Sequence, residues 1–169
     1  MERTGVITFK GNGMTLVGPE LKVGQPVPDF TVIGGDLGAV RLSDFKGQVV
    51  VISSVPSLDT PICEQQTIRF NKEAAALKAK VLTISMDLPF AQKRFCAANA
   101  INGVVTASDY KDRSFAQAFG LYIKELGLLA RAVFVVDKQG KLVYQQIVPE
   151  IASHPDYEPA LEAARAAGA

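Results

Sequence analysis

Strand-like and helical segments alternate three times in the middle of this 169-residue chain. The first strand-like segment, residues 49–55, is a nearly continuous apolar run, as expected of a strand buried on both faces. Two more follow at residues 81–86 and 104–107. The helical patterns after these strands cover residues 63–79, 89–99 and 114–119. Because strand–helix–strand units join parallel strands by right-handed crossovers, the sequence predicts an α/β fold.

Short antiparallel strands are expected before this alternation. Residues 5–10 and 14–17 flank a Gly-Asn-Gly sequence, which supplies the residues that a tight hairpin turn needs. Two short strands are then expected at residues 29–32 and 39–42, around a Gly-Gly pair. The sequence therefore predicts an N-terminal β-hairpin extension, residues 1–20, followed by further strands of the sheet.

The pattern changes again towards the C-terminus. Residues 132–136 and 141–144 flank an Asp-Lys-Gln-Gly sequence and predict an antiparallel hairpin. The tail at residues 157–167 is rich in Ala, Glu and Leu and predicts a closing helix. The expected fold is a mixed α/β sheet with helices on both faces. With 48% hydrophobic residues, the chain suits a single domain spanning residues 1–169.

The charge balance excludes two classes of partner. The chain has 18 basic and 17 acidic residues, and its formal net charge is +1. It contains no cluster of five or more Lys or Arg residues. We therefore expect neither a nucleic-acid partner nor binding to an anionic membrane surface.

The cellular location is predicted from the N-terminus and from the lengths of apolar runs. The first five residues, Met-Glu-Arg-Thr-Gly, lack the basic-then-apolar pattern of a secretory signal. No apolar run approaches the roughly 18 residues of a membrane-spanning helix. These features predict a cytoplasmic protein, and a periplasmic location stays open because a signal could precede this numbering.

The cysteine and histidine content argues against a disulfide scaffold and a metal site. Cys63 and Cys96 are the two cysteines, and their spacing is not C-x-x-C. The one histidine, His154, has the context of a solvated loop residue. A zinc site would need carboxylates to complete it, so neither a metal nor a cofactor is predicted. Three aspartates have the pattern of cap or turn residues: Asp87, Asp109 and Asp112.

The segment from Pro56 to Cys63 joins the first buried strand to its helix. Thr60 suits the N-cap and Pro61 the first helical position, which makes Cys63 the third helical residue. Unpaired N–H groups and the positive end of the helix dipole stabilise a nucleophilic thiolate there. The Thr60 hydroxyl is expected to accept a backbone N–H, or to donate to the sulfur, or both.

A structural interpretation of the same residues stays open at this point. Cys63 leads a core-facing stripe that continues at Phe70, Ala74 and Leu77, so it also fits a small buried apolar residue. Cys96 lies 33 residues later in a separate helix, where Lys93 and Arg94 would favour its thiolate, and it fits an inert core cysteine equally well. Arg131, before the strand at 132–136, fits a structural ion pair.

A family resemblance favours the chemical interpretation. Pro56-x-x-x-Thr60-x-x-Cys63 matches the P-x-x-x-T-x-x-C active-site motif of the peroxiredoxins. Residues 23–30, VGQPVPDF, resemble the Gly…Pro-Asp-Phe segment of that family. The N-terminal hairpin, the spacing from Cys63 to Cys96 and the context of Arg131 are similar to its thiol peroxidase subfamily, the atypical two-cysteine peroxiredoxins.

The resemblance implies a thioredoxin-like fold and a role for each site residue. Cys63 would be the peroxidatic cysteine and Cys96 the resolving cysteine. Thr60 would hydrogen-bond sulfur and peroxide, Pro56 would shield the pocket, and Arg131 would hold the thiolate and polarise the peroxide. Two cysteines at such helix positions need not meet the limit of about 7 Å between Cα atoms in a disulfide, so we expect local unwinding around both.

The implied activity is that of a thiol-dependent peroxidase. It would reduce hydrogen peroxide and organic hydroperoxides through a Cys63 sulfenic acid, which Cys96 resolves as an intramolecular disulfide. The resemblance further implies thioredoxin as reductant and a homodimeric state. The alternatives are a disulfide oxidoreductase or redox sensor, disfavoured by the absence of C-x-x-C, and a binding module with inert cysteines, disfavoured by the Thr60–Cys63–Arg131 combination.

Overall fold

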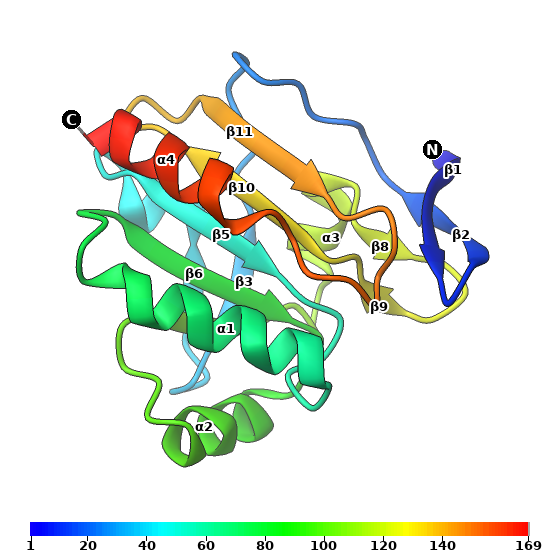
Figure 1. Ribbon diagram of the computed structural model, residues 1–169, viewed down its shortest axis with the longest axis horizontal. Helices are drawn as coiled ribbons and strands as arrows, with labels where there is room; N and C mark the ends of the chain where they lie inside the picture. Colours follow the sequence, from blue (N-terminus) through cyan, green and yellow to red (C-terminus); the bar gives the residue numbers. More distant parts are fainter. Residues whose placement is uncertain (169) are drawn as a thin grey trace.

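The computed structural model describes residues 1–168, and its centre is a seven-stranded mixed sheet (Figure 1). The strand order is β11-β10-β5-β6-β7-β3-β4. The strands are β3 (Thr31–Gly34), β4 (Ala39–Arg41), β5 (Val50–Ser54), β6 (Lys80–Ser85), β7 (Val105–Ser108), β10 (Ala132–Val136) and β11 (Leu142–Ile147). Strands β5, β6 and β7 are parallel, and β10 pairs antiparallel with both β5 and β11. The predicted parallel centre and C-terminal hairpin are confirmed.

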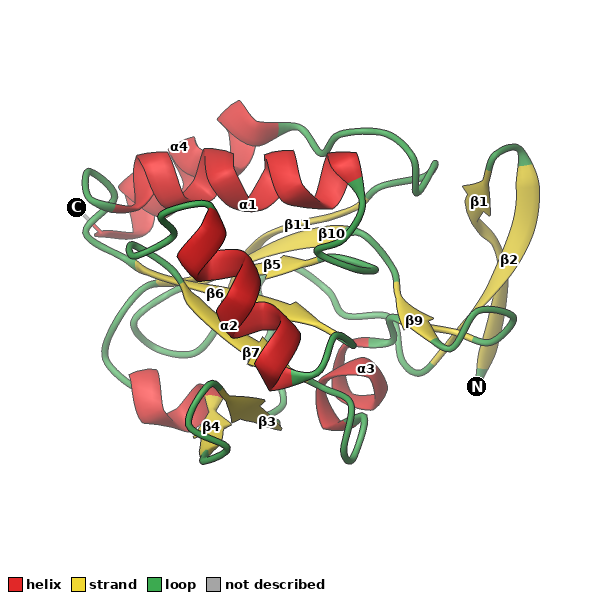
Figure 2. Ribbon diagram, turned by 90° about the horizontal axis from the view of Figure 1, so that it is seen from below, coloured by secondary structure: helices red, strands yellow, loops and turns green. Residues whose placement is uncertain are grey.

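Helices cover both faces of this sheet, as predicted. They are α1 (Pro61–Ala74), α2 (Pro89–Ala98), α3 (Ser114–Phe119) and α4 (Tyr157–Gly168), with a short 3-10 helix, η1, at Leu42–Phe45. Figure 2 shows α1 and α4 together above the sheet and α3 below it. Helix α2 packs against β7. Among residues 1–168, no helix combines the length and the apolar character that crossing a membrane requires.

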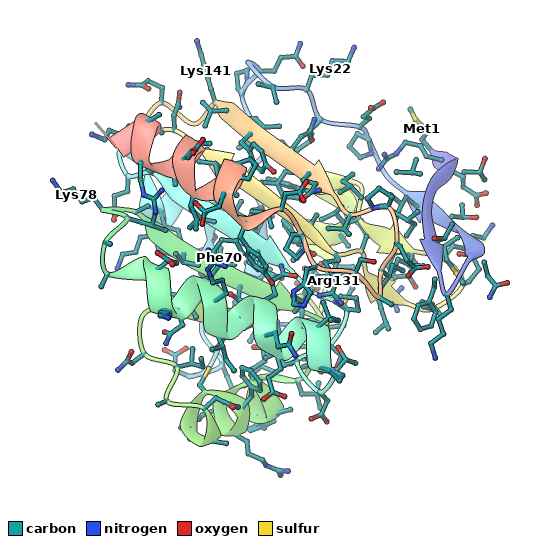
Figure 3. The ribbon with its side chains drawn as sticks, in the orientation of Figure 1. Met1, Lys22, Phe70, Lys78, Arg131 and Lys141 are labelled. Carbon is teal, nitrogen blue, oxygen red and sulfur yellow. The ribbon has the colours of Figure 1, made fainter. Side chains whose placement is uncertain are left out.

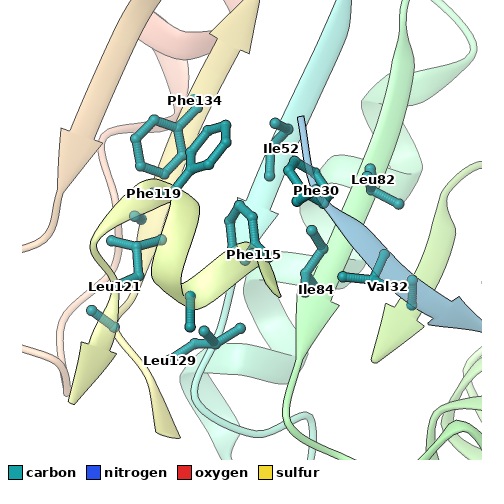
Figure 4. Close-up of a cluster of buried hydrophobic side chains, with 14 of the residues drawn as sticks. Phe30, Val32, Ile52, Leu82, Ile84, Phe115, Phe119, Leu121, Leu129 and Phe134 are labelled. Carbon is teal, nitrogen blue, oxygen red and sulfur yellow. The ribbon is translucent and has the colours of Figure 1, made fainter. Parts of the chain in front are cut away.

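Strand β5 is buried on both faces because its side chains alternate between two apolar clusters. Val51 packs with α1 and α4 on one face, together with Phe70 and Leu161. Ile52 points to the opposite face, where Phe115 and Phe119 of α3 lie (Figure 4). The two clusters hold the C-terminal end of β5, and the loop that follows it, in a fixed position.

Helix α1 ends at Ala74, five residues before the predicted end. Residues 75–78 form turns instead, and Lys78 takes the left-handed φ of 49°. The backbone must turn there because Lys80 already donates its N–H to the Val49 carbonyl at the start of β6. Leu77 is nevertheless buried, with 2% of its surface exposed, which is why the apolar stripe suggested a longer helix.

Three strands begin two or three residues away from their expected starts: β1 (Glu2–Phe9), β2 (Asn12–Val17) and β3. Strand β3 begins at Thr31, two residues after its expected start, and the Asp29 carboxylate before it accepts the N–H groups of Phe30 and Ser43. Strand β1 begins at Glu2, three residues before the expected start.

The N-terminal hairpin belongs to a second sheet that the sequence did not predict in full. Strands β1 (Glu2–Phe9) and β2 (Asn12–Val17) pair antiparallel, which confirms the hairpin. Two short strands, β8 (Tyr122–Ile123) and β9 (Leu128–Leu129), extend it in the order β1-β2-β8-β9. Strands of two residues show no periodicity, so the sequence pattern could not reveal them.

Candidate active site

The loop after β5 and the first turn of α1 position Cys63. Thr60 has extended backbone at the N-cap, with φ −121° and ψ 147°, and Pro61 is the first helical residue, as predicted. Cys63 is therefore the third residue of α1, and its side chain is completely buried. It packs against Val55 and Leu58, and Phe95 of α2 covers the same cluster. The predicted helix-start geometry is confirmed, and the sulfur lies beneath the loop.

Arg131 points its guanidinium group at this sulfur. Its Nη2 donates to Cys63 Sγ at 3.2 Å, although the two residues are 68 positions apart in the chain. Figure 3 shows Arg131 beside the N-terminal end of α1. Only 2% of Arg131 is exposed. Within residues 1–168 no carboxylate forms an ion pair with it, so the ion-pair interpretation is wrong.

Two further acceptors fix the plane of the guanidinium group. Arg131 Nη1 donates to Gln66 Oε1 at 3.0 Å, and Nε donates to the Ile151 carbonyl at 2.7 Å. Gln66 in turn donates from Nε2 to Ser53 Oγ at 2.7 Å. Because the guanidinium group is planar and its donors form a rigid fork, three contacts leave it one orientation.

Gln66 and the Ile151 carbonyl are site groups that sequence reasoning missed. For Gln66 a signal existed: it lies three residues after Cys63, on the same face of α1, and is a polar residue at a buried position. The Ile151 carbonyl carried no signal, because any residue presents the same backbone group.

The Thr60 hydroxyl does not cap the helix, contrary to one expectation. It donates to the Ser57 carbonyl at 2.9 Å and closes the turn that precedes α1. No hydrogen bond joins it to a helix N–H or to Cys63 Sγ within the described residues. The hydroxyl has one proton, and the carbonyl three residues earlier takes it, so the expected donation to sulfur is also absent from this conformation.

Asp87 holds the loop over the sulfur. Its Oδ1 accepts from Ser57 Oγ at 2.8 Å, and its Oδ2 accepts from the Leu58 N–H and from Ser85 Oγ, both at 2.7 Å. Pro56 is buried at the start of the same loop. The sequence predicted a cap or turn residue at Asp87. In the structure Asp87 also connects the end of β6 to the loop before α1, the helix that contains Cys63.

Cys96 is separated from Cys63 and faces a different strand. Its half-buried sulfur lies 3.6 Å from Thr106 Oγ1 of β7, and both cysteines are free thiols. Its neighbour Phe95 packs against the Cys63 cluster instead. A cavity of about 220 Å³ lies between the loop and α2, with Leu58, Asp87 and Phe95 in its lining. The structure thus brings Cys63 and Arg131 together, places Pro56 and Thr60 in the adjoining loop, and keeps Cys96 apart.

Comparison with known proteins identifies the family of this chain. The model of the Redoxin family matches residues 22–161. The chain is 57% identical over 161 residues to a thiol peroxidase of Bacillus subtilis, a match that covers 95% of this chain and 96% of that protein. The chain belongs to the thiol peroxidases of the redoxin family. A Listeria innocua thiol peroxidase is 54% identical over 162 residues, which are 95% of this chain and 98% of that protein.

The fold is likewise that of the peroxiredoxins. The structure of a peroxiredoxin-like protein from Aquifex aeolicus matches 97% of this chain and 96% of its own, with 45% identity and a TM-score of 0.90. The predicted thioredoxin-like fold and family are therefore confirmed. The Redoxin match begins after β2, so the N-terminal hairpin lies outside it.

Proposed function

We propose that this chain is a thiol-dependent peroxidase that reduces hydrogen peroxide and organic hydroperoxides, with Cys63 as its nucleophile. The observation that carries the proposal is the contact of 3.2 Å between Arg131 Nη2 and Cys63 Sγ, in a buried position without a competing carboxylate among the described residues. A guanidinium donor and the start of a helix both stabilise the thiolate over the thiol. Arg131 does not give up its proton, so its positive charge can stabilise negative charge in every step of the reaction.

In the first step the Cys63 thiolate attacks one peroxide oxygen. An S–O bond forms and the O–O bond breaks, so sulfur is oxidised to a sulfenic acid and the other oxygen leaves as hydroxide or alkoxide. The leaving oxygen takes a proton and departs as water or an alcohol. Arg131 stabilises the negative charge as it moves from sulfur to the leaving oxygen.

The loop above Cys63 must adjust to admit the substrate. Because the sulfur is completely buried, residues 56–60 have to shift before peroxide reaches it. We propose that the Thr60 hydroxyl then donates its hydrogen bond to the sulfur or the bound peroxide instead of the Ser57 carbonyl. Pro56 shields the reacting atoms from water. Such a change costs little, because one hydrogen bond replaces another.

In the second step the Cys96 thiolate attacks the sulfenic sulfur. An S–S bond forms, the S–O bond breaks, and the oxygen leaves as water after protonation. Cys96 reaches this position only if α2 unwinds near its C-terminal end, since its sulfur now contacts Thr106 and Phe95 lies next to Cys63. We propose thioredoxin as the dithiol that reduces the disulfide and completes the cycle.

Three further properties complete the proposal. The chain forms one domain over residues 1–169, acts in the cytoplasm and assembles as a homodimer. Their support is the peroxiredoxin resemblance together with the composition. Sedimentation of the purified protein over a range of concentrations tests the homodimer, and a monomer at every concentration would refute it.

The test of the function is peroxide consumption coupled to thioredoxin, its reductase and NADPH. Wild type should turn over, Cys63→Ser should be inactive, and Cys96→Ser should react once and then stall. A stoichiometric peroxide pulse should also remove two hydrogens from the intact mass of the wild type, because one intramolecular disulfide forms. Full turnover by Cys63→Ser would refute the proposed mechanism.

A further inference from the structure

The turn at residues 149–153 connects the active site to the N-terminal hairpin. On one side, the Ile151 carbonyl of the turn accepts a hydrogen bond from Arg131 Nε at 2.7 Å. On the other side, the turn pairs with β1: Thr8 donates its N–H to the Pro149 carbonyl at 2.7 Å, and Ile151 donates its N–H to the Thr8 carbonyl at 2.9 Å. The turn whose Ile151 carbonyl orients Arg131 is therefore attached to the end of the hairpin.

The Glu150 side chain reinforces this connection from the middle of the turn. Its Oε2 accepts the Ala152 N–H at 2.8 Å, which closes the turn on itself. Its Oε1 accepts the Gly11 N–H at 2.9 Å and Thr8 Oγ1 at 3.1 Å, which attaches the turn to the hairpin tip. The N–H groups of Ala152 and Gly11 lower the pKa of Glu150 to about 2, so the carboxylate stays ionised at neutral pH.

We propose that Glu150 is a positioning residue for the Arg131–Cys63 pair, acting through the Ile151 carbonyl. The inference rests on the proposed function, since it assigns Glu150 a part in orienting the group that stabilises the Cys63 thiolate. Glu150 itself touches neither the sulfur nor the substrate side of the guanidinium group. The Glu150 carboxylate stabilises the turn, and the Ile151 carbonyl of that turn orients Arg131 Nε. Because the guanidinium group is rigid and planar, any rotation at Nε also displaces Nη2, which donates to the sulfur.

This connection gives the N-terminal hairpin a role in the active site. Thr8 and Gly11 contact Glu150 and precede residue 22, where the Redoxin match begins. The hairpin therefore supports the arginine from outside the matched segment. A small displacement of a catalytic group lowers the rate strongly. The hairpin therefore affects the reactivity of Cys63 without contacting the reacting atoms.

The test is the Glu150→Gln variant in a Cys96→Ser background, where Cys63 is the one thiol. A Gln side chain has one acceptor oxygen, so its NH₂ group must face either the Ala152 N–H or the pair formed by Gly11 and Thr8. We expect the pH midpoint of Cys63 thiolate formation, followed by ultraviolet absorbance, to rise by about half a unit to one unit. The thiolate population below the midpoint then falls about three- to tenfold.

Glu125→Gln, in the same background, is the matched control. The Glu125 carboxylate also anchors the hairpin, accepting the Thr15 N–H at 2.9 and 3.1 Å, but no described contact leads from it to Arg131. It should leave the thiolate midpoint unchanged. If Glu150→Gln does not fold, Thr8→Val, which loses one hydrogen bond to Glu150, replaces it and should give a smaller shift in the same direction.

An unchanged midpoint in Glu150→Gln, or in Thr8→Val where that replaces it, overturns the inference. An equal shift in Glu125→Gln overturns it too, because the effect would then come from a loosened hairpin. The readout uses no peroxide. A wild type that fails to consume peroxide would therefore reject the proposed function, while the thiolate midpoints would still decide the role of Glu150.

Discussion

The Asp87 carboxylate accepts the Leu58 N–H at 2.7 Å and so joins the connection between β6 and α2 to the loop above Cys63. The same carboxylate accepts from the hydroxyl groups of Ser57 and Ser85. Each cysteine helix follows one of the two segments that meet at Asp87. This residue therefore links the start of the helix that contains Cys63 to the start of the helix that contains Cys96.

We predict that Asp87→Asn loosens this loop and slows the first oxidation of Cys63, because a less ordered loop positions the start of α1 and its sulfur less precisely, and this loss exceeds any gain in access. An Asn has one acceptor oxygen for three donors, so at least one buried donor loses its partner, at a cost of about 1–3 kcal/mol in the free energy of unfolding. The single-turnover rate with peroxide should fall several-fold. Urea unfolding and rapid-mixing measurements give the two quantities. Asp59→Asn is the matched control, because Asp59 is exposed and its carboxylate accepts no hydrogen bond within the described residues.

Arg131→Lys should keep the charge and lose the orientation. One ammonium group cannot reach Cys63, Gln66 and the Ile151 carbonyl as the planar fork does. We expect the second-order rate constant with peroxide to fall by about 10²-fold, the size of effect found when an oriented donor to a developing anion is lost. Stopped-flow measurement under single-turnover conditions gives this value.

Arg69→Lys is the control for that variant. Arg69 lies on α1, the helix that contains Cys63, but its partners are the surface carboxylates of Glu73 and Glu158, and exposed pairs of this kind contribute little. Its rate constant should equal that of the wild type. A rate for Arg131→Lys within a factor of two of wild type would contradict the role of the guanidinium fork.

The sequence predicted those parts of the site that depend on local backbone rules. Pro61 at the first helical position and Cys63 at the third follow from the fixed φ of proline and the preferences of the N-cap. The parallel pairing of β5, β6 and β7 follows from the strand–helix–strand pattern. Because these constraints act within a few residues or one repeated unit, they can be inferred without a structure.

The parts that the sequence did not predict depend on contacts between distant residues. Gln66 meets Arg131 across 65 positions, and Asp87 meets Ser57 across 30. The Thr60 hydroxyl was expected to accept from a helix N–H or to donate to sulfur, but it donates to the Ser57 carbonyl, which lies equally near in sequence. Local patterns indicate which side chains can form hydrogen bonds, whereas the tertiary fold decides which partner each one meets.

The buried Asp109 should make the protein more stable in mildly acidic solution. Burial raises the pKa of Asp109 from its ordinary 3.8 to about 6, although the N–H groups of Phe115 and Ala116 donate to its carboxylate. The folded protein therefore binds a proton at a pH where the unfolded chain does not. Its contribution to stability is present below the unfolded pKa and is lost as the pH rises through about 6.

The measurement is urea unfolding of the wild type and Asp109→Asn between about pH 7 and pH 5. The free energy of unfolding of the wild type should gain about 1 kcal/mol over this interval relative to the variant, which has no proton to bind. Taking the difference removes the contributions of other carboxylates, such as Glu150, whose lowered pKa acts in the opposite direction at lower pH. A constant difference between the two proteins would contradict the raised pKa of Asp109.

The left-handed Ala100 should determine how readily α2 releases Cys96. Ala100 follows the C-cap of α2 with a φ of 52°, a conformation that costs a residue with a Cβ roughly 1 kcal/mol or more. In Ala100→Gly this strain disappears, so the folded end of α2 is stabilised relative to its unwound form by about 0.5–1 kcal/mol. Formation of the Cys63–Cys96 disulfide should then slow about two- to fivefold, while sulfenic acid formation keeps its rate.

Quenched time points analysed by intact mass separate these two steps, because sulfenic acid adds an oxygen and the disulfide removes two hydrogens. Lys78→Gly is the matched control: Lys78 also has a positive φ, of 49°, but it lies in the turns after α1. It should stabilise the protein without changing the rate of disulfide formation. If Ala100→Gly forms the disulfide as fast as the wild type, the unwinding that delivers Cys96 does not begin at the C-terminal end of α2.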